Sequence, residues 1–414
     1  MLQSYPATHR LVRFSLAALV ACAALACSKK EEAKEAAPTT AAVTYDPGVT
    51  DTSIKIGQTM PYSGPASAYG TIGRVHTAYI KRLNEQGGIN GRKIELVSVD
   101  DAYSPPKAVE QVRKLVEQDQ VLLVFQSLGT PSNTAIQPYL NQKKVPQLFV
   151  SSGATKFGDP ERFPWTIGFN PSYQLEGKTY AEHLLRKHAG AKVAVLYQND
   201  DLGKDYLKGL KDTLGAKANM IVKEATYEVT DPTIDSQMAT LQASGATVFF
   251  NIATPKFAAQ AIRKAYDSGW KPVQYLVNVG ASVGAVLTPA GLQKSIGVIT
   301  AGYLKDPTDK QYENDPAMKE FLAFLAKYYP EGKAVDGANL YAYVTAQALE
   351  QVLKQCGNDL SRANIMKQAA SLKDWKSDLM NPTIAANTGP NDFHLFDKME
   401  LFRFNGETYE ALPE

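Results

Sequence analysis

The sequence predicts an α/β protein built from two lobes, and three observations lead to this fold class. Short apolar strands alternate with amphipathic helical stretches, which is the pattern of βαβ units in a largely parallel sheet. This pattern occurs in two consecutive series, and the end of the chain returns to strand-like alternation. The 414 residues also exceed the usual size of a single hydrophobic core. Two lobes with several chain crossings between them are therefore expected.

The first series begins with an alternating segment at residues 53–59, and a helix is expected over residues 69–85, where two glycines then stop it. Residues 121–125 are continuously apolar, as in a strand that is covered on both faces. The other elements expected in this series are strands at residues 93–99 and 145–150 and a helix at about residues 104–119.

The second series begins with a strand at residues 192–197 and a helix at residues 203–214. Its other strands are expected at residues 220–222, 247–250, 275–279 and 296–303, and its other helices at residues 234–243, 256–269, 316–329 and 336–356. Residues 393–397 and 400–404 then alternate like antiparallel strands around Asn405-Gly406.

Residues 1–26 have the features of an export signal. Three basic residues precede an uncharged run at residues 14–26, which has the length of a secretory apolar region. A membrane span needs about 20 apolar residues, so this run is too short to be an anchor helix. Cysteines preceded by small residues resemble a bacterial lipoprotein cleavage site; Cys27 is the predicted lipidation site, and Cys22 is the alternative. An ordinary secretory signal with chance cysteines is the remaining interpretation.

Residues 27–50 are charged, rich in Ala, Pro and Thr, and lack an apolar period, so they are expected to form a flexible tether. The formal net charge of +2 gives no electrostatic basis for binding nucleic acid. Only Cys356 remains after the leader, which excludes an internal disulfide. Its helical setting predicts a buried, inert thiol.

Five segments, in order along the chain, resemble the leucine/isoleucine/valine-binding branch of the type I periplasmic solute-binding proteins. They are IKIGQTMPYSGPASAYG (54–70), NEQGGINGRKIELVSVDD (84–101), VPQLFVSSGATKFGD (145–159), KVAVLYQNDDLGKD (192–205) and FHLFDKMELFRF (393–404). Each segment alone is a weak signal, but five at matching distances form a strong one. The resemblance implies two Rossmann-like lobes joined by three hinge crossings, with a ligand held between them and closure around it.

The resemblance assigns residues 51–172 and 304–378 to lobe 1 and residues 173–303 and 379–414 to lobe 2. It implies an extracytoplasmic solute-binding protein that serves the membrane permease subunits of an ABC importer. We expect a monomer in the periplasm or at the cell-envelope surface, held to a bacterial membrane only by its lipid. A ligand-sensing module for a membrane receptor is the alternative with the same fold.

Two loops are expected to grip a carboxylate on the ligand. Ligands of α/β sheets lie beyond the carboxyl ends of the strands, where helix N-termini favour negative charge. The resemblance implies that loops 127–132 and 151–155 both contribute, with a first-lobe aromatic wall beside them. The residues implied are Ser127, Leu128, Gly129, Thr130, Gly153, Ala154, Thr155 and, in the wall, Tyr69. Helix capping is the alternative role for the hydroxyl residues.

The second-lobe segments depart from the amino-acid binders of this family. The acidic residue that pairs with a ligand ammonium falls at Val279, Leu202 replaces a tyrosine, and the segment ending at Thr254 lacks an aromatic pair. A desolvated ammonium without a carboxylate partner loses about 2–5 kcal/mol. The departures therefore predict a small organic acid with an apolar or aromatic body and no α-amino group.

Two tyrosines, Tyr103 and Tyr303, are expected to form additional walls of the site. A branched-chain or other amino acid remains the alternative ligand, because with an alignment shifted by two or three residues Asp200 or Asp201 supplies the missing negative charge.

No enzyme, cofactor or metal site is expected. The five histidines lack metal-ligand spacing, and no nucleophile elbow, P-loop or dinucleotide-binding fingerprint is present. Asp100 and Asp101 follow an expected strand, but the resemblance implies a cleft rim or a structural turn at this position.

Overall fold

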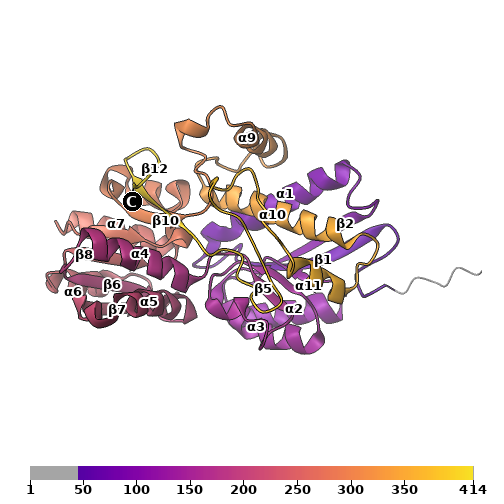
Figure 1. The fold of residues 1–414 in the computed structure, drawn as a ribbon, viewed down its shortest axis with the longest axis horizontal. Helices are drawn as coiled ribbons and strands as arrows, with labels where there is room; N and C mark the ends of the chain where they lie inside the picture. The colour runs from indigo at the N-terminus through magenta and orange to yellow at the C-terminus, as the bar shows by residue number, and fades with distance from the viewer. Residues whose placement is uncertain (1–44, 414) are drawn as a thin grey trace, which may run out of the picture. The chain divides into compact units, whose positions relative to one another are not determined.

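Two β-sheets organise residues 45–413, which are the residues that the computed structural model describes and which belong to one compact unit (Figure 1). The predicted leader at residues 1–26 and both candidate lipidation sites, Cys22 and Cys27, lie outside the described residues. None of the described helices has the length and hydrophobicity of a membrane-spanning segment.

The first sheet has five parallel strands in the order β2-β1-β3-β4-β5. Its strands are β1 (Ser53–Met60), β2 (Lys93–Asp100), β3 (Val124–Phe125), β4 (Gln147–Val150) and β5 (Thr166–Gly168). Helices α1 (Gly70–Glu85), α2 (Pro105–Glu117) and α3 (Thr130–Lys143) connect the first four strands. Ile54 and Ile56 are fully buried, because β1 lies inside the sheet and α1 and α2 pack against it.

The second sheet has seven strands in the order β12-β11-β10-β9-β8-β6-β7, and its middle is parallel. Its strands are β6 (Val193–Gln198), β7 (Ile221–Tyr227), β8 (Val248–Ile252), β9 (Val273–Leu276), β10 (Ile299–Gly302), β11 (Glu400–Phe404) and β12 (Tyr409–Ala411). Helices α4 (Tyr173–Lys187), α5 (Asp201–Leu214), α6 (Asp235–Ala243) and α7 (Pro255–Asp267) accompany these strands. Only β11 and β12 add an antiparallel edge.

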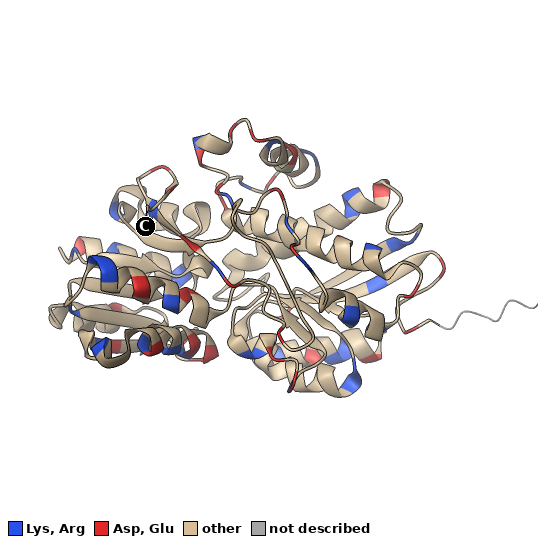
Figure 2. Ribbon diagram, in the orientation of Figure 1, with Lys and Arg blue, Asp and Glu red and all other residues tan. Residues whose placement is uncertain are grey.

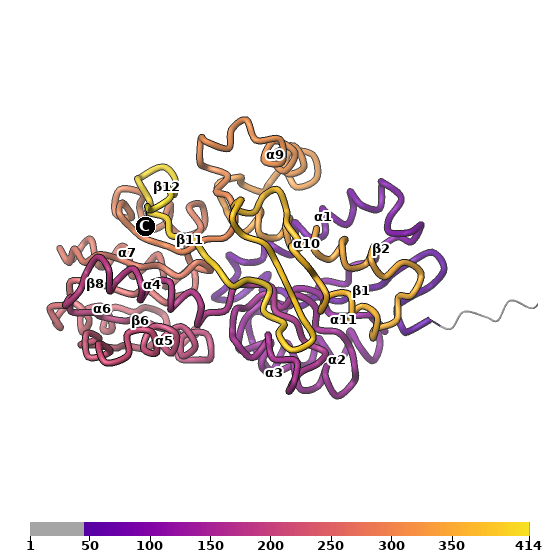
Figure 3. Tube along the Cα trace, viewed as in Figure 1, coloured from indigo at the N-terminus to yellow at the C-terminus, as the bar shows by residue number. Residues whose placement is uncertain are grey.

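The chain passes between the two sheet regions three times, after β5, after β10 and before β11 (Figure 3). The second passage leads into α9 (Pro316–Tyr328), α10 (Gly337–Cys356) and α11 (Arg362–Ala369). Helix α10 packs against α1, so this segment returns to the first lobe. The structure thus has the two α/β lobes that the sequence predicts, while the lobe boundaries in the sequence remain a prediction.

The predicted tether extends too far into the body of the protein. Residues 45–50 belong to the compact unit rather than to the tether. Lys55 N donates to Gly48 O at 2.7 Å, Arg362 N donates to Asp46 Oδ2 at 2.7 Å, and Val49 is buried. These residues have partners because they run beside the start of β1, so a boundary drawn from composition alone at residue 50 is wrong.

Three expected strands also differ from the structure. Residues 393–397 form no strand; the antiparallel pair around Asn405-Gly406 is formed by β11 and β12 instead. Residues 121–123 precede β3, whose ladder begins where Val124 pairs with Gly57. The strand expected to end at Val279 ends at Leu276, because the next residues turn into a short 3₁₀ segment, Asn278–Gly280.

Charged side chains of both signs are interspersed over the described helices and strands (Figure 2), in keeping with the formal net charge of +2. Cys356 ends α10 and is buried, as expected, and its burial raises the pKa of the thiol to about 12. This thiol is therefore protonated and unreactive near neutral pH.

Candidate functional site

A cavity of about 180 Å³ lies where the strand order of both sheets reverses. In the first sheet, β1 lies between β2 and β3, and in the second, β6 lies between β7 and β8. The segments after β1 and β3 supply Tyr69 and Gly129, and those after β6 and β8 supply Leu202 and Thr254. Ligands of open α/β sheets bind at such reversal points, beyond the carboxyl ends of the strands. The topology therefore brings two such points to one cavity.

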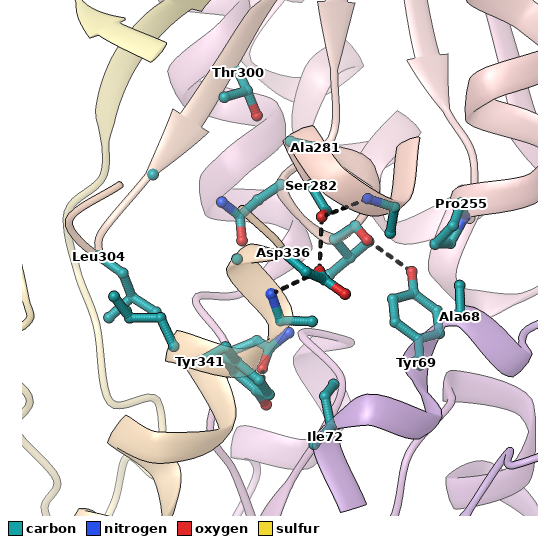
Figure 4. Close-up of a pocket in the computed structure, with 18 of the residues that line it drawn as sticks. Ala68, Tyr69, Ile72, Pro255, Ala281, Ser282, Thr300, Leu304, Asp336 and Tyr341 are labelled. Atoms are coloured by element: carbon teal, nitrogen blue, oxygen red, sulfur yellow. Dashed lines mark hydrogen bonds between the residues drawn. The ribbon is translucent and has the colours of Figure 1, made fainter. Parts of the chain in front are cut away.

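The cavity wall is mainly aromatic and aliphatic. Six tyrosines contribute to it: Tyr69, Tyr103, Tyr173, Tyr303, Tyr341 and Tyr409. Aliphatic side chains also line the cavity, including Leu128, Leu202, Val279 and Leu340, and Figure 4 shows Ile72 and Leu304 among them. A wall of this kind suits a ligand with an apolar body, oriented by a few polar groups.

The N-termini of α3 and α7 face the cavity without side-chain caps. The N-cap residues, Gly129 and Thr254, both line the cavity, and a proline follows within the first turn of each helix. In contrast, Asp200 caps α5 by accepting hydrogen bonds from Leu202 N and Gly203 N. Uncapped first-turn N–H groups carry positive partial charge and attract a carboxylate. An anionic ligand group is therefore best placed beside α3 and α7.

The first-lobe loops hold unusual backbone conformations beside the cavity. Ala102 and Tyr103 follow β2 with φ of 52° and 59°, and Gln126 follows β3 with φ of 51°. Non-glycine residues rarely adopt this left-handed region, and such strain is concentrated at functional sites. Asp101 Oδ1 fixes the first loop by accepting a hydrogen bond from Tyr103 N at 2.9 Å. The ring of Tyr103 is thereby held against Gly129.

Hydrogen bonds join the two lobes around the cavity. Tyr69 Oη donates to Val279 O at 2.7 Å, and Gly284 N donates to Val335 O at 2.9 Å. Thr155 donates to Asp205 Oδ2 from both its backbone nitrogen, at 2.7 Å, and its hydroxyl, at 2.6 Å. Each of these bonds connects a segment of the first lobe with a segment of the second, so the structure represents a closed arrangement of the two lobes.

Nine of the thirteen predicted binding residues line the cavity: Tyr69, Tyr103, Leu128, Gly129, Thr130, Leu202, Thr254, Val279 and Tyr303. The other four do not. Ser127 is buried behind the wall, Gly153 and Ala154 border a small separate void, and Thr155 is engaged by Asp205. The loop after β4 instead reaches the cavity through Ser151, and Ser152 supports it by a 2.7 Å hydrogen bond to Thr130 Oγ1.

Neither acid considered as a substitute near β6 reaches the cavity lining. Asp200 caps α5 and accepts from Gln198, and Asp201 pairs with Lys156 at 2.6 Å. The cavity does contain Asp336, the N-cap residue of α10, which the sequence analysis did not consider. The prediction that the ligand lacks an α-amino group rested on the absence of such a carboxylate, and Asp336 removes that premise.

Other polar or aromatic lining residues that sequence reasoning missed include Asn170, Tyr173, Asn278, Ser282, Tyr341 and Tyr409. An aspartate just before a long helix is a recognisable N-cap signal, so the capping role of Asp336 could have been found. Its position in the cavity could not, since it depends on how α10 packs against α1.

Asp101 should make stability depend on pH. Burial raises the pKa of its carboxyl to about 6, so the folded protein keeps a proton that the unfolded chain releases near pH 4. This contribution is fully present below about pH 4 and is lost as pH rises through 6. We expect urea unfolding between pH 4 and 7 to show a loss on the order of 2 kcal/mol that Asp101→Asn removes.

The control for this prediction is Asp267→Asn, which changes an exposed carboxylate of a surface ion pair. It should leave the slope of unfolding free energy against pH unchanged. Parallel pH profiles for the parent and Asp101→Asn would contradict the assignment.

Comparisons with known proteins identify the family of this chain. The family described as periplasmic binding protein matches residues 53–408. The chain belongs to the periplasmic binding protein family. The resemblance predicted from the sequence is thereby confirmed, and the relatives that the chain is similar to include leucine/isoleucine/valine-binding proteins.

Curated relatives of this periplasmic binding protein cover most of its length. An amino acid binding protein of Pseudomonas aeruginosa is 24% identical over 322 residues, which are 75% of this chain and 81% of that protein. Leu/Ile/Val-binding protein homolog 1 of Brucella abortus is 27% identical over 335 residues, 79% of this chain and 85% of that protein. Both relatives are named as binding proteins.

Solved structures show the same fold at lower identity. A branched chain amino acid ABC transporter protein from Thermus thermophilus with bound valine has a TM-score of 0.78 at 13% identity, covering 88% of this chain and 97% of that one. A fatty acid ABC transporter substrate-binding protein from Thermomonospora curvata has a TM-score of 0.75 at 23% identity, covering 89% and 94%. The type I periplasmic binding protein fold predicted from the sequence is therefore confirmed.

Proposed function

We propose that this periplasmic binding protein is the solute-binding component of an ABC importer and captures a small organic acid with an apolar or aromatic body. The observation that carries this proposal is the pair of uncapped helix N-termini, of α3 and α7, at one cavity between the lobes. They offer positive partial charge to a carboxylate, while tyrosines and aliphatic side chains surround the rest of the ligand.

The proposal includes attachment to a bacterial membrane. Cleavage before Cys27 leaves a lipid-bearing cysteine, and residues 28–44 then separate the lipid from the compact unit. A monomer held in this way delivers its ligand to the permease subunits of the importer. The mass of the mature N-terminus tests the anchor, because an unmodified cysteine there contradicts it.

The ligand is tested by thermal unfolding of the purified protein with a panel of carboxylic acids, after mass spectrometry of any molecule that co-purifies. An acid present at 100 times its Kd should raise the free energy of unfolding by about 2.7 kcal/mol. Thr130→Val should weaken the best acid about tenfold, because its hydroxyl lines the cavity and holds Ser152. Thr213→Val, on α5 outside the cavity lining, is the matched control. Absence of stabilisation by every acid would contradict the proposed function.

A further inference from the structure

Asp336 places a carboxylate in the cavity wall. It is the N-cap residue of α10, and Figure 4 shows its side chain between Ser282 and Tyr69. Both hydrogen bonds recorded for this carboxylate within the described residues fall on Oδ1, from Ser282 Oγ at 2.7 Å and from Ala338 N at 3.2 Å. The second oxygen, Oδ2, remains for a group inside the cavity.

The cavity wall supplies no cation for this carboxylate. Among the described lining residues, Lys305 is the single cationic one, and its Nζ pairs with Asp315 Oδ2 at 2.5 Å. The other lining aspartate, Asp306, is already satisfied on both oxygens by Thr308, Thr408 and Tyr409. Asp336 is therefore the lining carboxylate with an oxygen left for the ligand.

Closure of the lobes determines which hydrogen-bond donors reach the Asp336 carboxylate. Ser282 belongs to the second lobe and α10 packs on the first, so the bond from Ser282 to Asp336 forms across the cavity. The neighbouring bond from Gly284 N to Val335 O ties the same two segments together. Asp336 is half-buried in this arrangement, and the donors that reach its carboxylate are neutral, which leaves an ionised group poorly compensated. A cation carried by the ligand would correct this imbalance.

We propose that Asp336 binds a cationic amino group of the ligand through Oδ2, so that the ligand is a zwitterion. Its carboxylate lies at the N-termini of α3 and α7, and its amino group lies at the N-terminus of α10. This inference rests on the proposed function for the carboxylate end. It differs from the pattern seen in amino-acid binders of the family, because the acid comes from α10 rather than from the segment after β9.

The test compares pairs of acids that differ only in the amino group. The pairs are leucine with 4-methylpentanoate, phenylalanine with 3-phenylpropanoate, and 6-aminohexanoate with hexanoate, each measured by calorimetry at pH 7. In at least one pair the amino member should bind the parent protein about 30-fold more tightly or better. In the third pair, the amino member, 6-aminohexanoate, carries its two charged groups far apart.

The decisive variant is Asp336→Asn, whose amide oxygen can still accept from Ser282 and Ala338. It should remove the preference for the amino member of the pair, while the affinity for the simple acid stays within about threefold. The control is Asp359→Asn, an exposed carboxylate that also accepts a backbone N–H, from Ser361, outside the cavity. This control should preserve the preference.

Tighter binding of the simple acids by the parent protein would overturn the inference and leave the proposed function standing. An unchanged preference in Asp336→Asn would overturn it as well. Failure of every acid in the panel to bind would overturn the proposed function, and this inference with it.

Discussion

Replacing Gly129 with alanine is expected to lower ligand affinity by about 100-fold or more. A Cβ atom at this position would lie 2.6 Å from Cε2 of Tyr103, well inside van der Waals contact. Tyr103 cannot easily retreat, because it is buried, its own φ is 59°, and Asp101 holds its backbone nitrogen. The alanine would therefore displace either the cavity wall or the N-terminus of α3. Calorimetry with the tightest acid of the panel measures the effect.

Gly91→Ala is the matched control for this prediction. Gly91 also has a positive φ, 77°, but a Cβ there would meet nothing within 4 Å. Gly91→Ala should lose about 1 kcal/mol of stability from its positive φ. Gly129→Ala should lose more, because the clash with Tyr103 adds to its positive φ, and only Gly129→Ala should lose affinity. Parental affinity in Gly129→Ala would show that the contact between Tyr103 and Gly129 does not shape the site.

Replacing Glu176 with alanine is expected to destabilise the second lobe by about 3–5 kcal/mol. This buried carboxylate accepts three hydrogen bonds: from Tyr180 Oη at 2.7 Å, from Tyr206 Oη at 2.7 Å and from Asn278 N at 2.6 Å. Truncation would leave Tyr206 Oη and Asn278 N unpaired in the protein interior, whereas Tyr180 Oη retains Leu276 O as an acceptor at 2.8 Å. Urea unfolding of the parent and the variant at one pH measures the loss.

The same variant should weaken ligand binding, because two of these partners support the cavity wall. Asn278 lines the cavity directly, and Tyr206 stacks on Tyr173 with ring centroids 4.3 Å apart. Glu182→Ala, an exposed position on the same helix, is the control and should change stability by less than about 0.5 kcal/mol. An equal effect of Glu176→Ala and Glu182→Ala would refute the supporting role of Glu176.

The sequence alone determined the α/β class and the two series of strands and helices, and it predicted five first-lobe residues that line the cavity. The spacing of hydrophobic residues along the sequence indicates whether a segment is a helix or a strand and which of its faces is buried. Gly129 and Thr130 could be placed at the site because they follow an apolar strand and begin a helix. Ligands of open α/β sheets bind at such positions, beyond the carboxyl ends of the strands. The resemblance to the family added Tyr69, Leu202 and Val279 in the same way.

The tertiary structure alone decided which polar groups meet in the cavity. Thr155 and Thr130 both follow strands of the first sheet, yet the hydroxyl of Thr155 is bound by Asp205 of the second lobe. Asp336 and Ser282 lie on different lobes and meet because α10 returns to pack on α1. The walls of a cleft come from separate segments, and their pairing depends on sheet order and on chain crossings. Local sequence patterns contain no information about sheet order or chain crossings.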